Sequence, residues 1–223
     1  HLEPRVQGLQ PAAASRRFPL FYPIIMAQLP VVPSSRQQIR QHIRQMRRAL
    51  SPEQQNTAAL KAAERLLAWP EMVHAHHIAL FLSFDGELDT RPLIQTLWDQ
   101  GRAVYLPVLH PFSDGNLIMV RYLPESELVI NRLNIPEPRL DVRHILPLAG
   151  LDVLVTPLVA FDVQGQRLGM GGGFYDRTLQ HWQQHGFMPV GYAHDCQQVD
   201  ALPTEQWDIP LPAVATPSRI WQW

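Results

Sequence analysis

Four glycines fall within five residues of one segment, at Gly169, Gly171, Gly172 and Gly173. Glycine tolerates positive φ and lets backbone N–H groups converge on an anion. The segment lies between an apolar run that predicts a strand and a stretch that predicts a helix. Its G-x-G-G-G spacing differs from the Walker A pattern and from the dinucleotide fingerprint. The segment therefore predicts a phosphate-binding turn of another kind, and the alternative is a glycine-rich surface loop.

Charged side chains flank this turn on both sides. Arg167 precedes the glycines and Arg177 follows them, and arginine binds phosphate oxygens through paired N–H groups. Asp176 lies in the first turn of the predicted helix. A carboxylate this close to a phosphate indicates a bound divalent cation, whereas the simpler alternative is an acid that stabilises the start of the helix.

Two other groups of reactive residue types are weaker candidates. His74, His76 and His77 resemble a metal site, but no acid or further histidine follows at ligand spacing, so we expect a helix end or a strand start there. The segment His194–Cys196 holds the only cysteine, and catalytic partners meet in space rather than in sequence. A single cysteine also excludes a disulfide framework and a thiolate cluster for zinc or iron–sulfur.

Helical periodicity dominates the chain up to residue 70. A helix that begins after Ser35 has one apolar stripe, at Ile39, Ile43, Met46 and Leu50. Ser51 is a good N-cap for a second helix that runs to Ala68, and Gln54 completes a capping box. Two helices therefore precede the first predicted strand.

After residue 70, strands alternate with helices. Helices are predicted at 90–100 and 174–184, and residues 136–141 are predicted to form a loop. Short apolar runs predict strands at 77–83, 102–109, 116–123, 151–156, 189–193 and 213–216. This alternation is typical of βαβ units and predicts an α/β fold around a largely parallel sheet.

Composition limits the functional classes. The chain has 223 residues, 46% of them hydrophobic, and a formal net charge of −1. This near-zero net charge argues against a domain that binds nucleic acid through an overall positive charge. No apolar run is long enough to span a membrane. Residues 1–33 lack periodicity and are broken by prolines, so we expect a disordered extension or an artefact there. Residues 34–223 are expected to form a single α/β catalytic domain.

The string Gly165–Arg177, GQRLGMGGGFYDR, closely resembles the signature of the 5-formyltetrahydrofolate cyclo-ligases, also called methenyltetrahydrofolate synthetases. Other segments agree in order and spacing over about residues 36–220: Arg36–Arg40, Phe81–Thr90, Ile135–Pro138, Asp152–Asp162 and Leu202–Asp208. The resemblance implies a three-layer α/β fold of the sugar-phosphate isomerase and CoA-transferase type. It also implies ATP-dependent cyclisation of 5-formyltetrahydrofolate to 5,10-methenyltetrahydrofolate through a phosphorylated formyl group, an iminophosphate, with release of ADP and phosphate.

The resemblance assigns residues to roles. Catalysis would rest on Arg167 and Tyr175, and magnesium would bind Asp176 and Asp208. The ATP contacts would be Arg36, Arg40, Arg167, Leu168, Gly169, Met170, Gly171, Gly172, Gly173, Phe174 and Tyr175. The folate contacts would be Leu82, Glu87, Met119, Met170, Gly171, Gly172, Gly173 and Phe174.

Each of these assignments has a simpler alternative. Leu82 and Met119 are equally good core residues, Glu87 could be a loop acid, and Asp208 could be a turn residue before Ile209. Arg36 stands where the family often has lysine, and Phe174 where it often has tyrosine. Arg44 and Arg48 extend the basic helix stripe and are equally consistent with a solvated face.

The expected partners are a reduced folate and ATP, with Mg²⁺ as cofactor, and neither nucleic acid nor membrane. We expect a cytoplasmic monomer. One alternative is another phosphate-ester or CoA enzyme on the same fold, for which ATP would not be required. The other is a non-catalytic protein that binds folate, or RNA through the arginine helix, which predicts steeply salt-dependent affinity without turnover.

Overall fold

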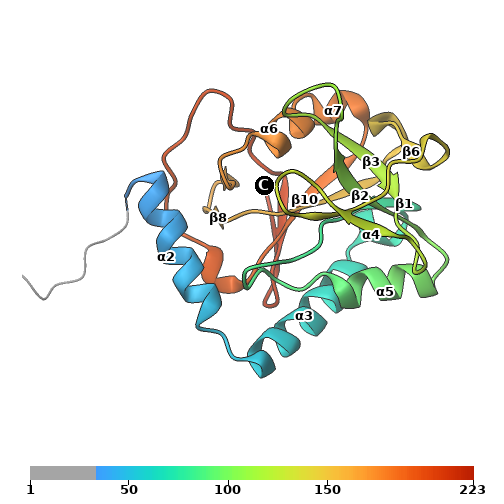
Figure 1. Ribbon diagram of the computed structural model, residues 1–223. Helices are drawn as coiled ribbons and strands as arrows, with labels where there is room; N and C mark the ends of the chain where they lie inside the picture. The colour runs from blue at the N-terminus through green and yellow to red at the C-terminus, as the bar shows by residue number, and fades with distance from the viewer. Residues whose placement is uncertain (1–33) are drawn as a thin grey trace, which may run out of the picture. The chain divides into compact units, whose positions relative to one another are not determined.

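An eight-stranded sheet forms the centre of the structure, a computed structural model that describes residues 34–223 (Figure 1). The strand order is β12-β11-β10-β7-β1-β2-β3-β6. Strands from β11 through β2 pair in parallel, whereas β12, β3 and β6 pair antiparallel with their neighbours. The strands are β1 (His77–Ala79), β2 (Ala103–Leu109), β3 (Leu117–Arg121), β6 (Ile145–Leu146), β7 (Val153–Thr156), β10 (Met188–Tyr192), β11 (Ala213–Ala215) and β12 (Ile220–Gln222). The predicted N-terminal extension lies outside the described residues.

The helices of the described part vary widely in length. They are α2 (Arg36–Arg48), α3 (Pro52–Leu67), α4 (Pro70–Val73), α5 (Arg91–Asp99), α6 (Phe174–Leu179) and α7 (Trp182–His185). Short 3₁₀ turns are η1 (Val142–His144), η2 (Leu148–Gly150) and η3 (Asp195–Gln197). Within residues 34–223, every helix is too short or too polar to cross a membrane.

Helices cover both faces of the sheet, which gives three layers. Because strand side chains alternate between faces, Val153 and Val155 of β7 point to one side and Leu154 to the other. The first side packs against α3 and α5 through residues such as Leu66 and Leu97. The second packs against the region of α6 and α7. This arrangement confirms the predicted α/β fold with a largely parallel sheet.

The first two helices begin where the sequence predicts. Ser35 with Gln38, and Ser51 with Gln54, form reciprocal capping boxes, each of which satisfies two otherwise unpaired backbone N–H groups. The apolar stripe of α2 ends earlier than predicted, because Met46 is exposed and Arg47 is buried in its place. The reason is that the last turn of α2 faces a polar loop rather than the core.

The predicted helix over 174–184 is wrong in one respect, since it is two short helices. His181 has a φ of 59° and interrupts the helix between α6 and α7. This left-handed residue redirects the chain. The predicted strand 77–83 is also shorter, since regular pairing ends at Ala79 and the chain then turns into the loop that carries Glu87.

The predicted loop at 136–141 contains a strand. Strand β5 (Pro136–Pro138) pairs with β4 (Leu128–Ile130) in a two-stranded ribbon. Hydrogen bonds from Asn131 N to Ile135 O and from Arg139 N to Glu127 O flank the ribbon. This pattern leaves both prolines at positions where no ladder N–H is needed, and that is why they are tolerated in the strand.

Candidate active site

The predicted site residues gather beyond the carboxyl ends of the parallel strands. The loop after β1 carries Glu87, and the segment after β7 leads into the glycine turn, which we define as residues 169–173. In α/β proteins this edge of the sheet is where ligands usually bind. Helix α2 lies alongside β8 (Ala160–Phe161) at the same edge (Figure 1).

The glycine turn connects a small hairpin to α6. Its preceding strand is β9 (Arg167–Leu168), which pairs with β8 outside the main sheet. Gly171 has a φ of 106° and Gly173 a φ of 75°, conformations that side-chain-bearing residues rarely adopt. A Cβ on Gly173 would also lie 3.2 Å from the Arg177 guanidinium. The glycines are therefore required by the backbone of this turn and by its close approach to Arg177.

Arg167 lies at the centre of a buried charged cluster. Its Nε donates to the Pro157 carbonyl at 2.9 Å, and its NH1 lies 3.6 Å from Asp176 Oδ1. The guanidinium carbon is 5.5 Å from the centroid of the Tyr175 ring. Burial lowers the pKa of Arg167, and the Asp176 carboxylate opposes that shift. Burial also raises the pKa of Tyr175, which keeps its hydroxyl protonated.

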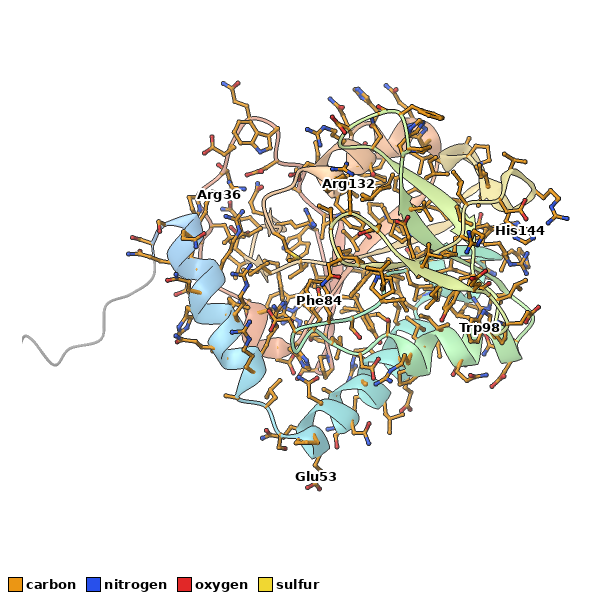
Figure 2. The ribbon with its side chains drawn as sticks, in the orientation of Figure 1. Arg36, Glu53, Phe84, Trp98, Arg132 and His144 are labelled. Atoms are coloured by element: carbon orange, nitrogen blue, oxygen red, sulfur yellow. The ribbon has the colours of Figure 1, made fainter. Side chains whose placement is uncertain are left out.

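Helix α2 supplies two more arginines to the cluster. Arg36, labelled at the start of α2 in Figure 2, donates to both carboxylate oxygens of Asp208, at 3.0 and 3.3 Å. Arg40 donates from Nε to the Gly169 carbonyl at 2.8 Å. The structure thus brings Arg40 to the glycine turn and Arg36 to Asp208, the second of the two predicted magnesium ligands.

Asp176 and Asp208 lie near each other with arginines around them. Burial raises the pKa of Asp176, Arg167 lowers it, and the Asp208 carboxylate raises it again. Asp208 also accepts from the Glu205 backbone N–H at 2.8 Å. Within residues 34–223, no group of three or more histidine, cysteine or acidic side chains has metal-binding geometry. Two carboxylates nevertheless fit magnesium, which takes one or two of them together with phosphate oxygens and water.

Glu87 is half-buried at the end of a tight turn that begins at Phe84. Its Oε1 accepts from the Phe84 backbone N–H at 3.1 Å. Burial raises the pKa of Glu87 to about 7, while this hydrogen bond and the charges of Arg47 and Arg167 oppose the rise. The carboxylate therefore changes charge near neutral pH, and it lies close enough to Arg167 for the charge of that arginine to lower its pKa.

The other predicted folate contacts differ in their exposure. Met170 is exposed on the glycine turn, and Phe174 is half-buried at the start of α6. Leu82 is half-buried against the core. Met119 is 2% exposed within the core, and this position favours the packing alternative for that residue.

Sequence reasoning missed one arginine and gave another a different role. Arg177, expected beside phosphate oxygens, donates to the Gly115 carbonyl at 3.2 Å and so ties the β2–β3 connection to the glycine turn. Arg47, overlooked in the basic stripe, is buried against the Asp85-Gly86 turn. The signal available in the sequence for Arg47 was the turn-forming dipeptide Asp85-Gly86.

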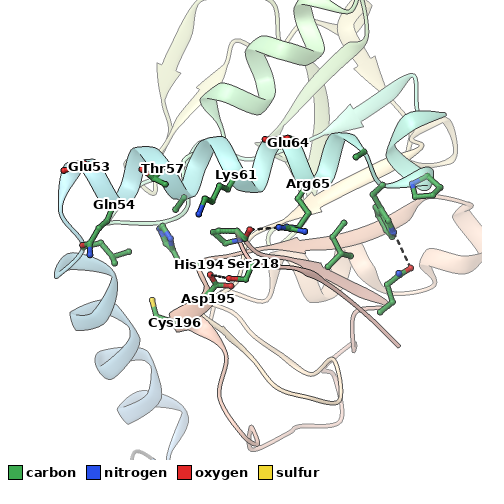
Figure 3. A pocket seen from close by; sticks show the side chains of 18 residues that line it. Glu53, Gln54, Thr57, Lys61, Glu64, Arg65, His194, Asp195, Cys196 and Ser218 are labelled. Carbon is green, nitrogen blue, oxygen red and sulfur yellow. Dashed lines mark hydrogen bonds between the residues drawn. The ribbon is translucent and has the colours of Figure 1, made fainter.

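The weaker candidates are located away from this cluster. Between α4 and β1, the backbone N–H groups of His76 and His77 bond to Asp152, as expected for a strand start. Burial raises the pKa of Cys196, the opposite of what activates a nucleophilic thiol. Cys196 lines a cavity of about 1190 Å³ between α3, η3 and residues 217–222 (Figure 3). None of the predicted site residues lines that cavity.

Comparison with known proteins agrees with this picture. Over 181 residues the chain is 67% identical to 5-formyltetrahydrofolate cyclo-ligase of Escherichia coli strain K12, covering 81% of this chain and 100% of that protein. It is 55% identical to the Haemophilus influenzae protein of the same name, over 79% of this chain and 94% of the relative.

Solved structures show the same fold. The NMR structure of 5,10-methenyltetrahydrofolate synthetase from Aquifex aeolicus superimposes with a TM-score of 0.72 at 27% identity, over 84% of this chain and 92% of that one. The synthetase from Mycoplasma pneumoniae, at 23% identity and a TM-score of 0.65 over 82% of this chain and 98% of that one, supports the fold alone. A model of the 5-formyltetrahydrofolate cyclo-ligase family matches residues 32–217. The chain therefore belongs to the 5-formyltetrahydrofolate cyclo-ligase family.

Proposed function

We propose that this chain catalyses the reaction of its family, the ATP-dependent cyclisation of 5-formyltetrahydrofolate to 5,10-methenyltetrahydrofolate, at the glycine turn. The observation that carries the proposal is the convergence of Arg167, Tyr175 and Asp176 with Arg40 on one turn. This set combines phosphate-binding cations, a positive-φ glycine backbone and a carboxylate. The partners are then a reduced folate and ATP, and the protein acts as a cytoplasmic monomer.

The chemical problem is a poor leaving group. In the proposed sequence the formyl oxygen attacks the γ-phosphorus of ATP and ADP leaves. N10 of the folate then attacks the formyl carbon and loses its proton, and the oxygen departs with the phosphoryl group as inorganic phosphate, which takes up that proton. Such phosphoryl transfer depends mainly on positioning and charge neutralisation, which is what buried cations and fixed backbone N–H groups supply.

Arg167 is the main stabiliser of charge in this scheme. Its Nε–H is already donated to Pro157 O, and its NH1 makes only a long contact with Asp176. The terminal N–H groups of the guanidinium can therefore donate to phosphate oxygens. Its burial strengthens these interactions because water screens them less. Arg40 and the glycine turn then bind the remaining phosphate oxygens.

Magnesium would be held by Asp176 and Asp208. When bound, the cation neutralises charge on the ATP phosphates. Both oxygens of Asp208 contact Arg36 in this structure, so Asp208 must share its carboxylate between the metal and Arg36. Asp176, with its single long contact to Arg167, is the more available of the two ligands.

Glu87 is proposed to accept hydrogen bonds from the pterin N–H groups. A carboxylate offers two acceptor oxygens, and here one of them is already oriented by the Phe84 N–H. Phe174 and Met170 provide apolar surface beside the same turn. Together they would place the formyl group next to the phosphate-binding turn.

The test is an absorbance assay for the methenyl product with 5-formyltetrahydrofolate in the presence and absence of ATP and magnesium. The proposal expects product and ADP in equal amounts, and no turnover when either ATP or magnesium is omitted. ATP-independent turnover, or folate binding without product, would contradict it. The matched control is Lys61→Ala, which changes a cavity residue outside the site and is expected to leave turnover unchanged.

A further inference from the structure

The turn that presents Glu87 has an unusual backbone. Asp85 and Gly86 both have positive φ, at 53° and 76°, and the Glu87 N–H donates to Phe84 O at 3.1 Å. Two successive positive φ values are typical of a type I′ turn, for which Asp-Gly is a preferred pair. Strain of this kind persists only where neighbouring groups hold it.

The group that holds this turn is the last part of α2. Arg47 NH2 lies 3.7 Å from Asp85 Oδ2, and a Cβ on Gly86 would be 3.1 Å from Arg47 Cβ. The turn backbone therefore rests directly on Arg47. On its other side, Gln55 donates to the Gly86 carbonyl at 3.0 Å.

Arg47 is buried far more deeply than the other arginine partners of Asp85. Its side chain is 4% exposed, compared with 62% for Arg48, whose Nε lies 2.6 Å from Asp85. The Nε of Arg47 is buried and has no hydrogen-bond partner. A buried cation is costly unless nearby negative charge compensates for it. Asp85 is already bonded by Arg48, so a second carboxylate is needed, and Glu87 is the acid whose charge most favours the protonated Arg47.

We propose that Arg47 is a positioning residue for folate recognition: it holds the Phe84–Glu87 turn, and with it the Glu87 carboxylate, against α2. This inference rests on the proposed function, in which Glu87 binds the pterin. Arg47 touches no reacting atom in the proposal. It acts on the substrate through the position and charge of Glu87.

The titratable groups around Glu87 come from three elements and from its own turn. These groups are Arg47 on α2, Arg167 on β9, the protonated Tyr175 on α6, and Asp85 within the turn. Burial is the largest influence on Glu87 and raises its pKa; Arg47 and Arg167 lower it, and Asp85 raises it. Removal of Arg47 is therefore expected to raise the pKa of Glu87 above about 7.

The experiment measures KM for 5-formyltetrahydrofolate and for ATP between pH 6 and 9 in Arg47→Met. We expect the folate KM at neutral pH to rise roughly fivefold, because about half of Glu87 is ionised at pH 7 in the wild type and a rise of about one pKa unit leaves about a tenth ionised. The rise should diminish at high pH, where Glu87 ionises even without Arg47. The KM for ATP should change by less than about twofold.

Two matched variants control for folding and for Asp85. Arg48→Met removes the exposed partner of the same aspartate, and its pH profile should match that of the wild type. Arg47→Lys keeps a cation and should recover most of the folate KM. If Arg47→Met does not fold, Arg47→Gln, which is polar but uncharged, takes its place, and a pH profile displaced as far in Arg48→Met as in Arg47→Gln would overturn the proposal.

A double variant separates this inference from the function on which it rests. If Arg47 acts through Glu87, Glu87→Gln and Arg47→Met/Glu87→Gln should have the same folate KM. Additive losses would overturn the positioning role. If Glu87→Gln itself leaves the folate KM unchanged, the assignment of Glu87 to folate fails instead. A direct ¹³C NMR titration of Glu87 in wild type and Arg47→Met would still report whether Arg47 sets its charge.

Discussion

Arg167 shows why the site depends on burial of charge. Its guanidinium is almost inaccessible, yet its nearest carboxylate contact is a long one, to Asp176 at 3.6 Å. Burying a cation with incomplete pairing costs stability, so the arrangement is unfavourable for folding alone. A phosphate between Arg167 and the glycine turn would compensate the charge.

Arg167→Ala is expected to lower turnover by about 10²–10³-fold, the usual cost of losing one preorganised stabiliser of developing charge. Steady-state kinetics with ATP and folate varied separately, together with thermal melts of the free protein, measure this. Because Arg167 also bonds to Pro157 O, Arg167→Lys is the informative control: it keeps the charge but loses the fork geometry. Wild-type turnover and ATP KM in Arg167→Ala would show that Arg167 takes no part in ATP binding or catalysis.

Glu87 is expected to make the protein less stable as pH rises. Its pKa is raised from 4.5 to about 7 in the folded state, so between these values the folded protein binds more protons than the unfolded one, and the free energy of unfolding falls with pH. The loss is complete above about pH 7 and amounts to at most about 3 kcal/mol. Urea unfolding of wild type and Glu87→Gln at pH 5 and pH 8 tests this, with the glutamine variant gaining relative stability at pH 8. An equal difference at both pH values would contradict the burial of this carboxylate.

At the scale of elements, the short helix α6 is positioned by a glycine in the left-handed region. Gly173 is its N-cap and has a φ of 75°, and Gly186 at the end of α7 has a φ of 88°. Alanine at either position should cost about 1 kcal/mol of stability through backbone strain. A Cβ on Gly186 would meet nothing within 4 Å, whereas one on Gly173 would press on Arg177.

Gly173→Ala is therefore expected to raise the ATP KM and lower turnover at least tenfold, while Gly186→Ala leaves both unchanged. Melting temperatures should fall by similar amounts in the two variants, so that the comparison separates strain from function. Equal losses of activity in the two variants would show that Gly173 affects activity only through the stability of the fold and has no specific role in ATP binding.

Asp176, in the first turn of α6, is the more available of the two proposed magnesium ligands. Asp176→Asn keeps the size and one oxygen ligand but removes the charge, so activity should require a several-fold higher magnesium concentration. A magnesium titration of turnover, paired with melts of the metal-free protein, makes the measurement. An unchanged magnesium dependence would show that Asp176 does not bind the metal and only stabilises the start of the helix. Asp208→Asn provides the comparison, because its carboxylate is already shared with Arg36.

The limits of sequence reasoning lie at the same scale. Capping boxes and apolar runs identify α2, α3 and the parallel strands, because these signals are local. The break at His181 and the Pro136–Pro138 strand depend on tertiary context, which overrides local propensity. Arg47 was missed for a similar reason: a helix stripe of arginines does not reveal which member faces a buried loop. The glycine turn was predictable because its positive-φ positions require a specific residue type.

At the scale of the whole molecule, the site draws on segments from nearly the full length of the described chain. Arg36 lies near its start and Asp208 near its end, and they meet through two hydrogen bonds. The sheet makes this possible because parallel strands deliver successive loops to one edge. The charged cluster around Arg167 and the core therefore both lie within residues 34–223, which form one compact unit.

Removal of residues 1–33 is consequently expected to leave turnover and melting temperature nearly unchanged. All contacts described for the site are made within residues 34–223, and the family model begins to match at residue 32. The Escherichia coli relative aligns over its whole length to 181 residues of this chain, so a protein of that size suffices for the family fold. The measurement compares kcat, both KM values and thermal melts of the full chain and of residues 34–223. A fall in melting temperature of more than about 4 °C, which corresponds to about 1 kcal/mol or more in a protein of this size, would show that the N-terminal segment stabilises the domain. A selective rise in ATP KM would instead show that the N-terminal segment contributes to ATP binding.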